Sequence, residues 1–276
     1  MRFDIVSIFP RIFDSYFNES ILKRAQKKGL IKIYIHNLRD YSSDKKHRKV
    51  DDRPYGGGPG MVLKIEPIYR AVQSARTKNK KSTFVPSPLR VRASESRTGR
   101  GKTKNKPPRT RVILLSAKGR QFDERMAEQL ARLDQLILIC GHYEGVDERV
   151  AKYVADEEVS VGPYIITGGE IPAMLVVDAV TRLLPGVLGK AESLEHRRSQ
   201  KLPNYKFSLD PEFRTKGQIP NSRPHGYSVY TRPGVFSPRR LADSRQKVVQ
   251  WRVPKMLLSG NHKKIEEWRK ITAHLS

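Results

Sequence analysis

The chain has 276 residues, and its 54 lysines and arginines against 28 aspartates and glutamates give a formal net charge of +26. A surplus of this size is typical of proteins that bind a polyanion, most often nucleic acid. A single cysteine, Cys140, excludes a disulfide framework and a cysteine-based zinc site. The sequence contains no lipidation motif, basic amphipathic helix or long apolar run, so a membrane surface is not the expected partner. Asp4 interrupts the apolar N-terminus and no cleavage site follows, so we expect a cytoplasmic protein without a signal peptide.

The first part of the chain predicts an alternation of strands and helices, because residues with period-2 alternation are followed by stretches of helical periodicity. The expected elements are a strand at Arg2–Phe9, a helix from Pro10 to about Lys28, a strand around Ile31–Ile35, a loop over residues 50–60 and a helix around Glu66–Ser74.

Residues 76–111 break this pattern. They contain thirteen basic residues and one acid, Glu95, and few apolar side chains. Burial cannot offset the entropy of ordering such a segment, so we expect most of it to be a disordered basic insertion. Two roles remain open for it, a solubilising loop and a contact with RNA.

Regular structure should resume with a strand over 112–116, a helix over 123–133 and a strand over 135–140. These strands are continuous apolar runs, which favours an α/β fold with a parallel sheet covered by helices on both faces. Residues 190–237 are rich in proline, glycine and charge and predict a flexible linker with a second basic insertion. Residues 238–276 predict a short helical unit.

The segment Gly162-Pro-Tyr-Ile-Ile-Thr-Gly-Gly-Glu170 leads into an almost wholly apolar helix that ends at Arg182. Glycine allows a backbone to approach a ligand where a side chain would block it. Two glycine sites around a short apolar strand therefore predict a pocket lined by main-chain amides and carbonyls. The alternative is a strand, a tight turn and a buried helix that bind nothing.

Six blocks follow one another in a characteristic order: Asp51–Met61, Cys140–Arg149, Val161–Glu170, Leu184–Gly189, Tyr230–Pro233 and Leu258–His262. Together they resemble the bacterial tRNA (guanine-N1)-methyltransferases of the knotted SPOUT superfamily, over roughly residues 1–75, 111–194 and 228–270. The resemblance implies a SPOUT domain over 1–189 with a mostly parallel sheet and a deep C-terminal trefoil knot. It also implies a small all-helical tRNA-binding domain over 238–276, and an obligate homodimer whose active sites both subunits share.

The implied reaction is S-adenosylmethionine-dependent methylation of N1 of guanosine 37 in tRNA, next to the anticodon. The family is associated with magnesium dependence, but no carboxylate cage typical of Mg²⁺ is evident in this sequence, so no metal ligand is predicted. Pro163 replaces a residue that is usually aspartate and lacks the N–H that could contact the cofactor. By the resemblance, the cofactor is held by Leu115, Ser116, Gly141, Val161, Gly162, Pro163, Tyr164, Ile165, Ile166, Gly168 and Gly169.

Guanine N1 carries a proton, so methylation needs a general base, and negative charge then builds on O6, where a cation should lie. The catalytic arginine of the family falls on Arg182, although an intrahelical ion pair with Asp178 is the simpler reading. Glu144 falls on an acidic residue near the target guanine, where the alternative is a surface loop glutamate.

The family's general base falls on Arg197, which cannot accept a proton near neutral pH. Glu195, two residues earlier, is our candidate base, and His196 is an alternative on pKa grounds. The main hypothesis is an active methyltransferase, and its rival is a catalytically silent RNA-binding relative. A P-loop hydrolase is excluded, because no Gly-Lys-Ser or Gly-Lys-Thr follows the glycine-rich loop at 56–60.

Overall fold

The computed structural model describes residues 1–80, 108–188, 228–238 and 249–273. Its centre is a five-stranded sheet in the order β2-β1-β6-β5-β7, in which every neighbouring pair is parallel. The α/β class and the parallel sheet are thereby confirmed. The strands are β1 (Arg2–Ser7), β2 (Lys32–Asn37), β5 (Thr110–Gln121), β6 (Gln135–Cys140) and β7 (Glu157–Ser160).

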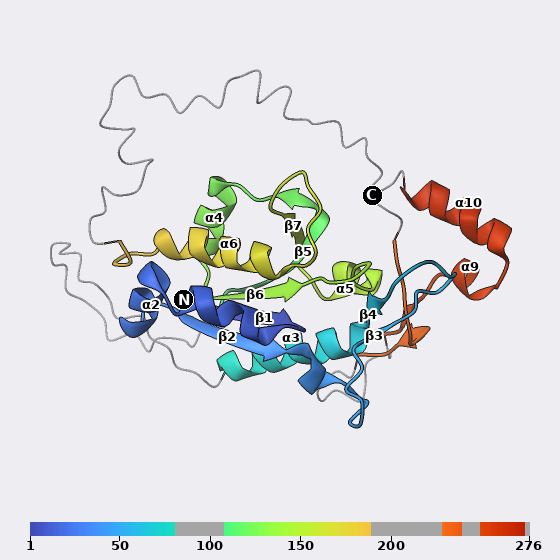
Figure 1. Ribbon diagram of the computed structural model, residues 1–276, viewed down its shortest axis with the longest axis horizontal. Coiled ribbons are helices and arrows are strands. Elements are labelled where there is room, and N and C mark those ends of the chain that lie inside the picture. The colour runs from blue at the N-terminus through green and yellow to red at the C-terminus, as the bar shows by residue number, and fades with distance from the viewer. Residues whose placement is uncertain (81–107, 189–227, 239–248, 274–276) are drawn as a thin grey trace, which may run out of the picture.

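Helices cover both faces of this sheet (Figure 1). One layer contains α2 (Ser20–Lys27), α4 (Glu124–Ala131) and α6 (Glu170–Arg182), and the other contains α3 (Ile65–Lys80) and α5 (Glu148–Tyr153). The alternation of β6 explains the two cores: Leu136 and Leu138 pack with α6, whereas Ile137 and Ile139 pack with α3. Both faces of β6 are therefore buried, as its apolar sequence predicts.

The predicted helix from Pro10 to Lys28 is interrupted, so that prediction is wrong in its continuity. A 3-10 turn, η1 (Pro10–Phe13), leads into α1 (Asp14–Phe17), and α2 starts afresh at Ser20. The Asn18 side chain donates a hydrogen bond to the Asp14 carbonyl at 2.8 Å. A side-chain donor of this kind competes with backbone amides for the carbonyl and so favours a break in the helix. Tyr16, just before the break, is exposed.

The short strand expected between Gly162 and Gly168 is absent, and that prediction is wrong. The segment is a loop with one isolated bridge, between His142 and Gly168. Its apolar residues find no neighbouring strand, and Ile165 is 87% exposed. At the borders of the first basic stretch, residues 76–80 belong to α3 and Thr110–Arg111 to β5, while 81–107 lie outside the described residues.

The C-terminal part is a small unit beside the carboxyl edge of the main sheet (Figure 1). It has a helical end, as expected, and also a two-stranded sheet that the sequence did not predict. Its core contains Tyr230, Val253, Leu257 and Ile265. The unit consists of β8 (Val235–Phe236), β9 (Trp251–Arg252), α9 (Lys255–Leu258) and α10 (His262–Ala273), and it lies against the loop between β3 (Asp51–Asp52) and β4 (Val62–Leu63).

Part of the stretch expected to be a flexible linker is packed, since Tyr230 and Phe236 are buried. Residues 190–227 of that stretch lie outside the described residues. Within the four described ranges, no helix is long and apolar enough to span a membrane.

Candidate active site

At the carboxyl edge of the sheet, β6 and β7 end beside the point where the regular pairing of β5 is interrupted after Leu115. Leu115 of β5 pairs with Cys140 of β6 and with Val159 of β7. The residues that follow these positions, Ser116 and Gly141 among them, therefore emerge side by side. Ligands of parallel α/β sheets bind at this edge, and the structure brings the strand-end members of the predicted cofactor set to it.

The loop over residues 161–169 (the cradle loop) folds back onto the end of β6. The amide of Gly169 donates to the carbonyl of Gly141 at 2.8 Å, and Gly168 bridges His142. A Cβ on Gly169 would lie 2.6 Å from the Cα of Cys140, so only glycine allows this approach. The sequence predicted that this glycine would give a ligand access to the backbone. In the structure, it allows the backbone of the cradle loop to pack directly on the backbone at the end of β6.

The same loop turns on Ser160, whose hydroxyl donates to the Gly162 carbonyl at 2.9 Å. The Tyr164 ring covers Gly162, where a Cβ would meet the ring at 2.3 Å. Pro163 and the apolar residues Ile165 and Ile166 are exposed. The loop thus presents an apolar outer surface and keeps its glycines inside. The loop and the neighbouring Leu115, Ser116 and Gly141 together contain every predicted cofactor residue.

Glu144 reaches this edge from the loop between β6 and α5. Its amide donates to the Met61 carbonyl at 3.1 Å, and its side chain covers Gly60. A Cβ on Gly60 would lie 2.5 Å from Glu144 Cγ. The exposed carboxylate is therefore held over the glycine-rich loop of residues 53–60.

A buried carboxylate lies under the cradle loop, and the sequence analysis did not assign it. Glu170 is 4% exposed and accepts a hydrogen bond from Ser7 Oγ at 2.7 Å. Its other oxygen lies 3.8 Å from His142 Nδ1. Burial, together with the Glu170 charge, raises the pKa of the Cys140 thiol well above its ordinary value, so this cysteine stays protonated. The only sequence signal for Glu170 is an acid in the first turn of an apolar helix.

Arg182 lies at the opposite end of α6. It lines a cleft of about 640 Å³ between the N-terminal helical turns, α4 and α6. Burial raises the pKa of Asp178 in this cleft, and the Arg182 charge opposes that rise. Burial and the Asp178 charge likewise raise the pKa of Tyr16. Arg182 thus has Asp178 as a charged neighbour, but among the described residues the two form no ion pair within 4.0 Å, and Arg182 is exposed.

The predicted catalytic arginine and the predicted cofactor loop are separated within one chain. α6 runs the 13 residues from Glu170 to Arg182. At a rise of 1.5 Å per residue, its two ends lie about 20 Å apart. Glu195, the candidate base, lies outside the described residues, as do His196 and Arg197. In the described ranges, no group of three or more His, Cys, Asp or Glu side chains could hold a metal ion.

Known proteins similar to this chain share one activity in their names. A statistical model of the family described as tRNA (Guanine-1)-methyltransferase TrmD matches residues 1–275. A tRNA (guanine-N(1)-)-methyltransferase of Dehalococcoides mccartyi is 41% identical over 270 residues, covering 98% of this chain and 84% of the relative. One from Clostridioides difficile is 39% identical, covering 98% and 91%. The crystal structure of tRNA (m1G37) methyltransferase from Aquifex aeolicus aligns with a TM-score of 0.54 at 33% identity, covering 97% of this chain and 87% of that one.

Proposed function

Because this chain belongs to the tRNA (guanine-1)-methyltransferase family, we propose that it methylates N1 of guanosine 37 in tRNA with S-adenosylmethionine as the donor. The observation that carries this proposal is the meeting of the β5 irregularity after Leu115 and the ends of β6 and β7 with the cradle loop, in a chain that matches the family from residue 1 to residue 275. A net charge of +26 suits a tRNA substrate.

The donor site consists of Leu115, Ser116, Gly141 and the cradle loop. S-adenosylmethionine supplies a methyl group already activated as a sulfonium, so the protein has to bind and align it. Main-chain groups around Gly141, Gly162 and Gly168 suit an uncharged adenosine moiety, because they offer donors and acceptors without added charge. Pro163 contributes no amide hydrogen, so the cofactor must be held through its neighbours.

Each active site needs two copies of the chain. The exposed stripe of α6 carries Ile171 (60% exposed) and Leu175 (40% exposed) and ends at Arg182. Tyr16 and Ile165 add further exposed apolar surface around it. An apolar patch of this kind favours an interface. A homodimer through this stripe brings Arg182 of one protomer to the donor site of its partner, which the length of α6 prevents within one protomer.

The catalytic roles follow from the charge changes on guanine. As the methyl group bonds to N1, the N1 proton passes to a base, and the charge left on O6 needs a nearby cation. Arg182 supplies the cation. Glu195 accepts the proton, in place of the family acid at the position of Arg197. Glu144, held over Gly60, positions the guanine beside the donor.

The proposal also assigns the trefoil knot, the domain ranges, the segments that contact tRNA and the cellular location. The SPOUT domain spans 1–189 with a C-terminal trefoil knot, 190–237 is the connecting segment, and the helical unit from 238 to 276 binds tRNA. The two basic stretches, 76–111 and 197–223, contact tRNA phosphates, and the protein acts in the cytoplasm without a membrane partner. Mg²⁺ assists through the bound substrates, and no protein ligand is assigned to it.

Methyl incorporation into a tRNA transcript tests this function directly. We expect radioactive methyl transfer to a transcript with G37, and none to a matched transcript with A37. The variant Glu195→Gln should lose most transfer while it still binds both substrates. A wild-type protein that binds S-adenosylmethionine and tRNA but transfers no methyl group would establish the silent RNA-binding relative instead. Full activity of Glu195→Gln would leave the function standing and overturn only the choice of base.

A further inference from the structure

A buried ion pair, Asp147–Arg149, joins the active-site loop to the C-terminal segment. Both side chains are 0% exposed. Arg149 Nε donates to Asp147 Oδ1 and Arg149 Nη2 to Asp147 Oδ2, each at 2.8 Å, so the pair is bidentate. Asp147 also caps α5, because its Oδ1 accepts from the Arg149 amide at 3.1 Å. The pair is thus fixed where the loop that carries Glu144 ends.

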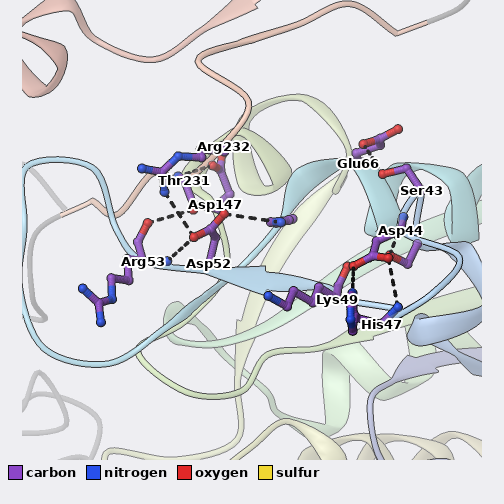
Figure 2. Close-up of polar contacts among 12 residues, drawn as sticks. Ser43, Asp44, His47, Lys49, Asp52, Arg53, Glu66, Asp147, Thr231 and Arg232 are labelled. Carbon is purple, nitrogen blue, oxygen red and sulfur yellow. Dashed lines mark hydrogen bonds and ion pairs between the residues drawn. The ribbon is translucent and has the colours of Figure 1, made fainter.

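The other guanidinium donors hold the C-terminal segment. Arg149 Nη2 donates to the Thr231 carbonyl at 2.7 Å, and Nη1 donates to the carbonyls of Pro233 at 2.7 Å and Trp251 at 3.4 Å. With the two bonds to Asp147, all five N–H groups of the guanidinium are used. Asp147 Oδ2 in turn accepts from the Thr231 amide at 2.7 Å (Figure 2). One side chain therefore binds the backbone that leads into both β8 and β9.

The glycine-rich loop of residues 53–60 completes the junction. The Thr231 hydroxyl donates to the Arg53 carbonyl at 3.0 Å, and the Tyr55 amide donates to the Tyr230 carbonyl at 2.8 Å. In Figure 2, Thr231 lies between Asp147 and Arg53. The segment that leads to α9 and α10 is thereby held between two loops, and Glu144 spans the same two loops through its contact with Gly60.

We infer that Arg149 is a positioning residue for tRNA: it fixes α9 and α10 relative to Glu144 and the donor site. The C-terminal unit has a core of few buried residues, and its Phe236 and Trp251 pack on Tyr69 of α3. The Arg149 junction adds directional, charge-assisted bonds to this apolar contact. Lysine cannot replace Arg149, since one ammonium group cannot make the bidentate pair and reach three carbonyls at once. The inference rests on tRNA being the substrate.

The test compares Arg149→Lys with wild type in the full-length protein. We expect tRNA to bind about tenfold more weakly, because charged hydrogen bonds to the segment are lost, while S-adenosylmethionine affinity stays within about threefold. Amide exchange should show lost protection at Thr231 and Val253 but not in β1 or β6. Arg70→Lys is the matched control, since Arg70 makes a partly exposed pair with Glu66 at 2.6 Å, and it should behave as wild type.

A folded Arg149→Lys protein with wild-type tRNA affinity would overturn the inference. Equal losses of tRNA and S-adenosylmethionine binding would also overturn it, because Arg149 would then support the whole core. If this variant does not fold, Thr231→Val decides, since it removes only the hydroxyl bond to Arg53. It should weaken tRNA binding about threefold, and an unchanged affinity would contradict the inference. Failure of wild type to transfer methyl is a separate result, because tRNA affinity is measured without transfer.

Discussion

The two ends of α6 differ in burial and in the way the surrounding backbone packs. At its N-terminal end, Glu170 is buried under the cradle loop, and glycines allow backbone to pack directly on backbone. At its C-terminal end, Arg182 is exposed in the cleft that α6 shares with α4. In the proposed function, the first end binds the donor and the second supplies half of the catalytic centre. A centre that uses both ends then combines two protomers.

The largest expected effect is on the rate of methyl transfer, from a substitution at the C-terminal end of α6. Arg182→Ala should lower the single-turnover rate of methyl transfer by about a thousandfold, because the charge on guanine O6 loses its cation. S-adenosylmethionine affinity should change little, because in the proposed site Arg182 contacts guanine O6 and the donor is held by the cradle loop. Rapid quench with labelled donor and isothermal titration measure the two quantities. Arg132→Ala, at the exposed end of α4, is the control; equal rate losses in both variants would remove the special role of Arg182.

A substitution at the N-terminal end of α6, beside the cradle loop, should lower donor affinity. Gly169→Val places a side chain against the Cys140 backbone, where even a Cβ lies only 2.6 Å away. We expect donor affinity to fall about a hundredfold as the cradle loop is displaced, which corresponds to about 3 kcal/mol. Gly234→Ala is the matched control, because its Cβ would meet nothing closer than 3.7 Å. Titration that finds unchanged donor affinity in Gly169→Val would exclude the loop as donor site.

The opposite edge of the sheet provides a structural contrast. Asp4 is 0% exposed and bonds to Arg2, His36 and Gln135. Asp4→Asn should lower the free energy of unfolding by about 3 kcal/mol, because Arg2 keeps its charge without a partner. The rate of transfer per folded molecule should stay near wild type. Urea unfolding monitored by circular dichroism checks the first expectation, and a large loss of activity per folded molecule would contradict the second.

The same residue predicts a pH dependence of stability. Burial alone would raise the pKa of Asp4, but hydrogen bonds from His36, Arg2 and Gln135 outweigh it and hold the pKa below its ordinary value. A depressed pKa means that this contribution is complete above about pH 4, the ordinary aspartate pKa, and is lost as the pH falls through the folded value. The difference in unfolding free energy between wild type and Asp4→Asn should therefore shrink below about pH 4. A difference that is constant to pH 2 would argue against the ionised pair.

The smallest effect concerns the first basic stretch. Deleting residues 82–106, which leaves α3 and β5 whole, should weaken tRNA binding and reduce the slope of log affinity against log salt. Donor affinity should not change. Binding measured between 50 and 200 mM salt gives the slope, and an unchanged slope would show that the stretch makes no phosphate contacts.

The sequence predicted the strands of the sheet and the family better than the long-range polar contacts between side chains and backbone. β6 was predicted to the residue, because its apolar run between Asp134 and Gly141 has clear ends. The cradle loop was mistaken for a strand, because Tyr164, Ile165 and Ile166 have strand propensity and only tertiary structure shows that no partner strand is present. Arg149 was visible in a family block, but its role depends on carbonyls more than eighty residues away. Long-range polar contacts of this kind leave no local pattern.

The sharing of one site by two protomers is tested most directly with mixed dimers. A subunit with Arg182→Ala and a differently tagged subunit with Gly169→Val would be co-expressed and isolated through both tags. Each variant alone should be inactive. In the mixed dimer, the intact cradle loop of one subunit meets the intact Arg182 of the other, so we expect one working site and about half of the wild-type transfer per dimer. A mixed dimer as inactive as its parents would place both ends of the site in one chain and contradict the account.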